Sequence, residues 1–124
     1  MNVVRRQFIV GAAAMAAVPG LARAGETSMY GLIGQFIAQP GQRDALTAIL
    51  LESLTGMPGC LSYVVGHDPA NPDLIWITEV WTDQASHQAS LQLPQVQAGI
   101  ARARPLIAGF GERFETQPIG GVGL

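Results

Sequence analysis

The residues that decide the fold are LIWITEVWTDQASHQASL, positions 74–91. In an extended chain successive side chains point to opposite faces. One face of the predicted strand therefore carries Ile75, Ile77, Glu79 and Trp81, and the other carries Leu74, Trp76, Thr78 and Val80. Both faces are rich in apolar groups, and each large apolar side chain left in water costs about 1.5–3 kcal/mol. The stretch therefore predicts a strand that is covered on both sides.

A helix is predicted directly after this strand. Asp83 can cap a helix that runs to about Leu91, because its carboxylate can accept hydrogen bonds from the first free backbone N–H groups. His87 lies four residues after Asp83 and shares its helix face. A structural contact between these two side chains is therefore expected.

Turn-forming residues divide the rest of the chain into pieces of similar length. Three further strands are predicted, at 29–38, 60–67 and 110–117. Two further helices are predicted, at 42–55 and at 94–104. The order β-α-β-β-α-β is that of the ferredoxin-like α+β fold, in which helices cover one face of a four-stranded antiparallel sheet. Within the first strand, Gly31 and Gly34 predict a bulge or the close approach of another backbone.

Helices on one face leave the second face of such a sheet uncovered. The chain has no spare element to cover it, so a second copy of the same sheet is the expected cover. The sequence therefore predicts a homodimer with a barrel-like space between the subunits.

The first residues, MNVVRRQFIVGAAAMAAVPGLARA, have the pattern of a secretory signal that ends at Ala24. The apolar part is too short for a membrane-spanning helix, so no permanent membrane anchor is expected. Arg5 and Arg6 resemble the twin-arginine export signature, although Val4 and Val10 stand where that signature favours other residues; ordinary export is the alternative. Residues 25–124 are thus predicted to form one domain in the periplasm or outside the cell.

Composition excludes several classes of function. Residues 25–124 hold four arginines, no lysine and nine acidic residues, a net charge of −5, so nucleic acid is not an expected partner. Cys60 is the only cysteine, so no internal disulfide can form, and no His, Lys or Arg lies within five residues to activate the thiol. We expect it to be a small buried apolar residue. The two histidines and Cys60 have no recognisable zinc or iron spacing, so no metal site is predicted.

Three segments together resemble the antibiotic biosynthesis monooxygenase family. They are MPGCLSY at 57–63, EVWTDQASHQASL at 79–91 and PQVQ at 94–97, and the resemblance extends from Tyr30 to about Thr116. It implies a dimeric α/β barrel and, for the quinol monooxygenases of the family, oxidation by O2 without metal or flavin. Ser90 and Gln95 stand where many members carry further histidines. The strand at 29–38 lacks the asparagine of the haem-degrading branch, so haem degradation is not expected.

The resemblance places Trp81 at the substrate cavity. Its ring could stack on a quinol while its indole N–H donates to an oxygen; a plain core or interface tryptophan is the alternative. Glu79 shares the strand face of Trp81, and a carboxylate facing inward needs a partner or a raised pKa. Arg113 on the last strand is the candidate partner, in a pair that is either structural or part of substrate binding.

His67 ends its strand beside Asp68 and could accept a phenol proton near pH 7; a solvated histidine is the alternative. Tyr63 shares the strand face of His67, so the two could form one wall of the pocket. His87 is a further candidate for substrate contact, beside its structural role.

Two functions are compatible with these residues. The first is a cofactor-independent monooxygenase that oxidises a small quinol or polyphenol with O2, in a pocket between the helices and the sheet of a dimeric barrel. The alternative is a non-catalytic dimeric module of the same fold that binds a small ligand or serves in a stress response.

Overall fold

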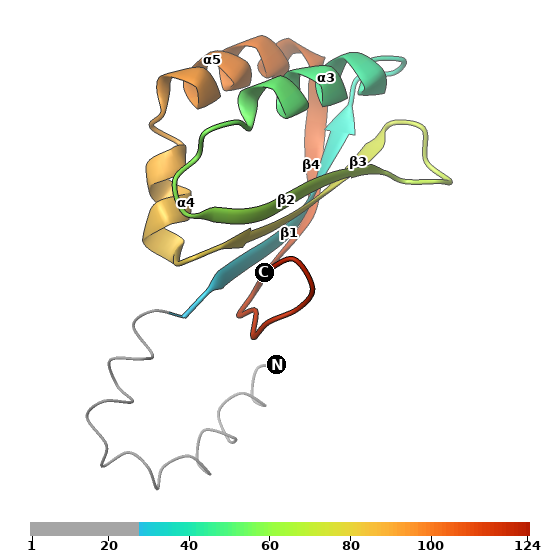
Figure 1. Ribbon diagram of the computed structural model, residues 1–124. Coiled ribbons are helices and arrows are strands. Elements are labelled where there is room, and N and C mark those ends of the chain that lie inside the picture. Colours follow the sequence, from blue (N-terminus) through green and yellow to red (C-terminus); the bar gives the residue numbers. More distant parts are fainter. Residues whose placement is uncertain (1–27) are drawn as a thin grey trace, which may run out of the picture.

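The computed structural model describes residues 28–124 (Figure 1). The strands are β1 (Tyr30–Ala38), β2 (Cys60–His67), β3 (Leu74–Trp81) and β4 (Ile107–Thr116). The helices are α3 (Arg43–Ser53), α4 (Gln84–Ser90), α5 (Pro94–Ala103) and the short 3-10 helix η2 (Arg104–Leu106). This order confirms the β-α-β-β-α-β prediction. The second helical region consists of α4 and α5, as the sequence predicted, followed by η2. The predicted signal at 1–24 lies outside the described residues.

The four strands form one antiparallel sheet in the order β2-β3-β1-β4, as the ferredoxin-like fold requires. β4 begins earlier than predicted, because Ile107 already pairs with Ala38 at the end of β1. The predicted bulge is confirmed at Gly34, where the pairing of β1 with β4 shifts register. At Gly31 the groups that approach closely are side chains and not a backbone, because a Cβ there would collide with the side chains of Thr116 and Pro118.

One face of the sheet is covered by helices. α3 and α5 lie side by side over it, and α4 lies near the end of β3 (Figure 1). The main core cluster joins the sheet to α3 and α5 through Ala38, Leu46, Ile49, Ile75, Ile77 and Ala103. A second cluster consists of Tyr30, Leu32 and Trp81. The strand face that the sequence assigned to Ile75 and Trp81 is thus the face that packs against the helices.

The predicted cap of α4 is present. Asp83 has an extended backbone, and its carboxylate accepts a hydrogen bond of 2.8 Å from the backbone N–H of Ser86. This cap fixes where α4 begins, and therefore which of its side chains turn toward the sheet.

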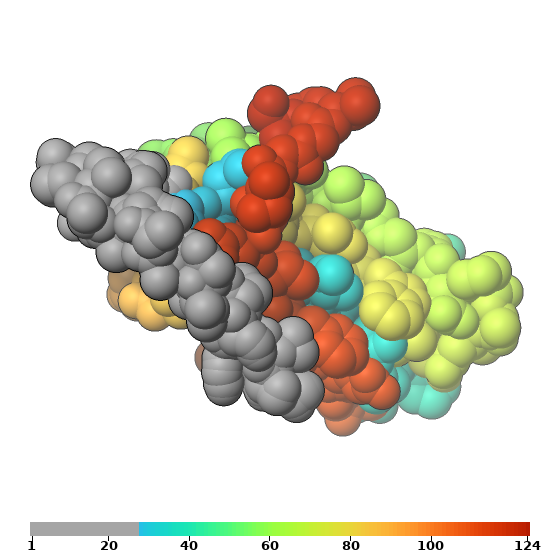
Figure 2. Space-filling model, turned by 90° about the horizontal axis from the view of Figure 1, so that it is seen from below, coloured from blue at the N-terminus to red at the C-terminus, as the bar shows by residue number. Residues whose placement is uncertain are grey.

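The other face of the sheet lies away from α3 and α5. Figure 2 shows the molecule from this side, with side chains of the strands at the surface beside the C-terminal tail. Val64 of β2 is 56% exposed and Phe114 of β4 is 49% exposed. Every residue of β4 from Gly111 to Thr116 is exposed, and such an edge strand is available for pairing with another chain.

The contact between α3 and α5 depends on Gly99. A Cβ at this position would come within 2.7 Å of the Cβ of Ser53. We expect Gly99→Val to force the helices apart and to lower the free energy of unfolding by about 1–3 kcal/mol, as measured by urea denaturation. The exposed neighbour Ala98 supplies the control, since Ala98→Val costs only helix propensity, about 0.6 kcal/mol. Equal losses in the two variants would show that Gly99 is not a packing position.

Candidate functional site

Glu79 is the buried charged group at the centre of the site. It lies on the helix-facing side of β3, opposite Leu32 on β1 and Tyr63 on β2, and is 8% exposed. The indole N–H of Trp81 donates a 2.8 Å hydrogen bond to its Oε1. Burial raises the pKa of Glu79, and the hydrogen bond from Trp81 and the charge of Arg113 oppose that rise. A carboxylate in this setting can accept a proton more readily than an exposed one.

His87 reaches Glu79 from α4. Its ring lies 5.4 Å from the ring of Tyr30 and 5.4 Å from the ring of Trp81, and its Nε2 lies 3.7 Å from Oε1 of Glu79. The expected contact with Asp83 is wrong: the helix turns His87 toward the sheet, while Asp83 bonds to the backbone of Ser86. Burial and the charge of Arg113 lower the pKa of His87, so its imidazole is neutral near pH 7.

Arg113 belongs to a second polar group beside Glu79. Its Nη2 lies 3.5 Å from the hydroxyl of Tyr30 and 3.8 Å from Oε2 of Glu115, to which the Tyr30 hydroxyl donates a hydrogen bond of 2.5 Å. The expected direct Glu79–Arg113 pair is therefore wrong. Register explains the difference, since Arg113 lies opposite Gly34 rather than Leu32, and its nearest carboxylate is Glu115 on its own strand.

Glu79 and Arg113 nevertheless line one cavity, which we call the Glu79 cavity. It has a volume of about 280 Å³. The other lining residues are Leu32, Gly34, Gln35, Phe36, Ile77, Phe110, Gly111 and Glu112. Phe36 and Phe110 meet edge to face, with ring centroids 5.2 Å apart and an angle of 84°. The cavity thus combines a mostly apolar wall with the buried carboxylate of Glu79, the guanidinium of Arg113, the exposed carboxylate of Glu112 and the amide of Gln35. A mostly apolar wall with a few polar groups is the pattern of a small-molecule site.

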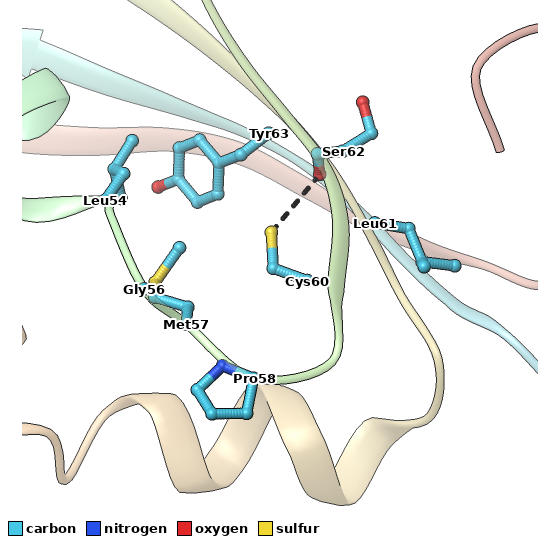
Figure 3. Close-up of a pocket in the computed structure, with 8 residues that line it drawn as sticks. All are labelled: Leu54, Gly56, Met57, Pro58, Cys60, Leu61, Ser62 and Tyr63. Atoms are coloured by element: carbon cyan, nitrogen blue, oxygen red, sulfur yellow. Dashed lines mark hydrogen bonds between the residues drawn. The ribbon is translucent and has the colours of Figure 1, made fainter.

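A wider groove lies at the start of β2. It has a volume of about 650 Å³ and opens broadly to solvent. Met57, Cys60 and Tyr63 point into the space between β2 and the loop that follows α3, whereas Leu61 points to the opposite side of the strand (Figure 3). Burial raises the pKa of Tyr63 and of Cys60, so both groups keep their protons at neutral pH. This supports an unreactive Cys60, although the residue is half-buried rather than fully buried.

Four sequence candidates lie apart from the lining of the Glu79 cavity. Tyr63 lines the wider groove, and His87 reaches Glu79 from α4. The other two are Trp81 and His67. Trp81 is 1% exposed and its N–H is already bonded to Glu79, so it holds the carboxylate from behind. His67 lies opposite Ile75, four residues along β3 from Glu79, and its Nε2 is 2.8 Å from the Thr47 hydroxyl. Its role as a base stays a prediction.

Sequence reasoning missed the apolar walls of the cavity. Leu32, Gly34 and Phe36 alternate along β1, and this alternation is the signal that could have placed them on the face of Glu79. No sequence pattern placed Phe110 at the cavity, because its contact with Phe36 depends on the register shift between β1 and β4.

The described residues, 28–124, contain no group of three or more His, Cys, Asp or Glu side chains that could hold a metal ion. Within the same residues, no helix is long and apolar enough to cross a membrane.

Comparison with known proteins agrees with this geometry. The sequence model of a family described as antibiotic biosynthesis monooxygenase matches residues 29–102. A crystal structure from Chloroflexus aurantiacus J-10-fl, whose description assigns it to the antibiotic biosynthesis monooxygenases, shares 65% identity and a TM-score of 0.74, over 76% of this chain and 96% of that chain. No curated protein matches the chain.

Two more distant structures share the fold. One, from Caulobacter crescentus CB15, has 16% identity and a TM-score of 0.69, over 77% of this chain and 93% of that chain. The other, Rv0793 from Mycobacterium tuberculosis, has 20% identity and a TM-score of 0.64, over 77% of this chain and 99% of that chain.

Proposed function

The chain belongs to the antibiotic biosynthesis monooxygenase family, and on that premise we propose that it oxidises a small quinol or polyphenol with O2 in the Glu79 cavity, without a metal or organic cofactor. One atom of O2 enters the substrate and the other leaves as water, with all electrons supplied by the substrate. The observation that carries the proposal is a buried carboxylate of raised pKa in a cavity whose wall is mostly apolar and includes two phenylalanines.

The size of the cavity supports a substrate of one or two rings. An engineered protein cavity of about 150 Å³ holds one benzene molecule, and the Glu79 cavity has about 280 Å³. The edge-to-face pair of Phe36 and Phe110 offers a wall against which an aromatic ring can pack.

The polar groups of the cavity support removal of a phenolic proton. In our proposal Glu79 accepts the proton from the substrate hydroxyl, and the guanidinium of Arg113 stabilises the phenolate that forms. A phenolate gives up an electron to O2 far more readily than a phenol does. Tyr30 and Glu115 support this role, because they hold Arg113 at the edge of the cavity.

A homodimer completes the proposal. The exposed edge strand β4 and the exposed apolar side chains Val64 and Phe114 support a second copy as the cover of the open face. Phe110 lines the Glu79 cavity and is itself 69% exposed, so a cover at β4 would also close the cavity from water. With the signal predicted at 1–24, the substrates are compounds that reach the periplasm.

Oxygen uptake tests the proposal. The purified, chelator-treated protein is mixed with a panel of quinols, catechols and anthrones, and O2 consumption and product are followed. We expect protein-dependent uptake, with one atom of ¹⁸O from labelled O2 in the product. Ligand binding without O2 uptake by a folded protein would contradict the proposal and favour the non-catalytic binding module.

A further inference from the structure

Two side chains approach the Glu79 carboxylate: His87 from α4, and Trp81 from the end of β3. Nε2 of His87 and Nε1 of Trp81 both approach the same atom, Oε1 of Glu79, at 3.7 Å and 2.8 Å. The rings of Tyr30 and Trp81 hold the imidazole in this place. Packing alone would be satisfied by an apolar ring here, so the polar edge aimed at a buried carboxylate requires another explanation.

The charged and titratable groups around His87 come from three strands. They are Glu79 on β3, Tyr30 on β1, and Arg113 and Glu115 on β4. On its own helix, Asp83 is engaged in the cap. Burial and Arg113 together outweigh Glu115, so the imidazole is neutral near pH 7 and has a nitrogen free to take up a proton.

We propose that His87 is a positioning residue for Glu79 that also receives the proton which Glu79 removes from the substrate. This inference rests on the proposed function and adds a proton path to it. The substrate O–H bond breaks as an O–H bond forms on Glu79; that bond then breaks as an N–H bond forms at Nε2 of His87. Glu79 returns to the carboxylate form, the imidazole becomes an imidazolium, and no electrons are transferred in these steps.

The geometry suits such a path. The separation of 3.7 Å is about half an ångström longer than a hydrogen bond, and catalytic hydrogen bonds commonly shorten when substrate binds. The His87 side chain is 14% exposed and that of Glu79 is 9% exposed. The part of the imidazole that is exposed gives the proton a way on to water.

An NMR titration of the imidazole signals tests the coupling without any substrate. We expect Glu79→Gln to lower the titration midpoint of His87 by about 1 pH unit, because an imidazolium loses its neighbouring anion. His67 serves as an internal reference, since it bonds to Thr47 and lies away from Glu79. A His87 midpoint that does not move would overturn the proposal, whether or not the protein proves to be an oxygenase.

Kinetics then separate proton transfer from packing. We expect His87→Ala to lower kcat about 10²-fold with little change in KM, and added imidazole to restore part of the loss. His87→Phe keeps a ring between Tyr30 and Trp81 but should stay impaired. The exposed neighbour Gln88 gives the control, with Gln88→Ala within about twofold of the parent protein. Full activity in His87→Phe, or a loss in His87→Ala that imidazole does not restore, would show a purely structural role.

Discussion

Replacing Glu79 with glutamine is expected to lower kcat by about 10²–10⁴-fold while making the protein more stable at neutral pH. The activity falls because an amide cannot accept the substrate proton. Glutamine has the same shape, and its amide oxygen can still accept the hydrogen bond from Trp81. Steady-state O2 uptake and urea denaturation at several pH values measure the two effects.

The stability gain follows from the direction of the pKa shift. Burial raises the pKa of Glu79 in the folded state above its value in the unfolded chain. The folded state therefore binds the proton more tightly, and the stability that Glu79 contributes is present below the unfolded pKa and is lost as pH rises through the folded pKa. Glutamine does not ionise, so the variant does not lose this stability as pH rises. Above about pH 4.5 its free energy of unfolding should therefore depend less on pH than that of the parent protein.

An exposed carboxylate provides the control for the same substitution. The Glu52 side chain is 61% exposed and pairs only at the surface with Arg102. Glu52→Gln should change kcat less than about twofold and stability by less than about 1 kcal/mol. If Glu79→Gln instead loses stability at neutral pH and keeps its turnover, Glu79 is a structural residue and the proposed site is wrong.

Replacing Trp81 with phenylalanine should cost about 2–4 kcal/mol of folding free energy. Trp81 is 1% exposed, so the smaller phenylalanine ring leaves a void in the core. The variant also removes the hydrogen bond that the indole N–H donates to the buried carboxylate of Glu79. That hydrogen bond lowers the pKa of Glu79, so its loss raises the pKa further. Because a base must be ionised to act, the acidic limb of the pH–rate profile should move to higher pH.

Trp76 supplies the matched control. The Trp76 indole N–H also donates a hydrogen bond to a carboxylate, Oδ1 of Asp68, at 3.0 Å. Trp76, however, lies on the face of β3 opposite to Glu79 and Trp81. Trp76→Phe should leave the pH–rate profile in place. A pH–rate profile that is equally unmoved in Trp81→Phe would mean that Glu79 is not the group whose ionisation controls the rate.

The sequence was sufficient for the fold because its signals are local. Alternation from Leu74 to Trp81 and the cap at Asp83 each act within a few residues, and each appears in the structure where it was expected. These features determine element order and the inward face of β3.

The site needed information that no local pattern contains. Which carboxylate Arg113 meets depends on the register of β4 against β1, strands that are about 80 residues apart in sequence. The direction of His87 depends on how α4 packs on β3, whereas the spacing of four residues predicted Asp83 as its partner instead of Glu79. Glu79, Arg113 and His87 were therefore identified as residues of interest, but their partners were not.

The contact of Trp81 with Glu79 and His87 gives the molecule a fluorescent reporter of its own. The chain has two tryptophans, so a Trp76→Phe background leaves emission from Trp81 alone. Protonated imidazole quenches indole emission strongly, and the His87 ring lies 5.4 Å from that of Trp81. The charge state of the site can therefore be followed optically in stopped flow, during a single turnover and without any added label.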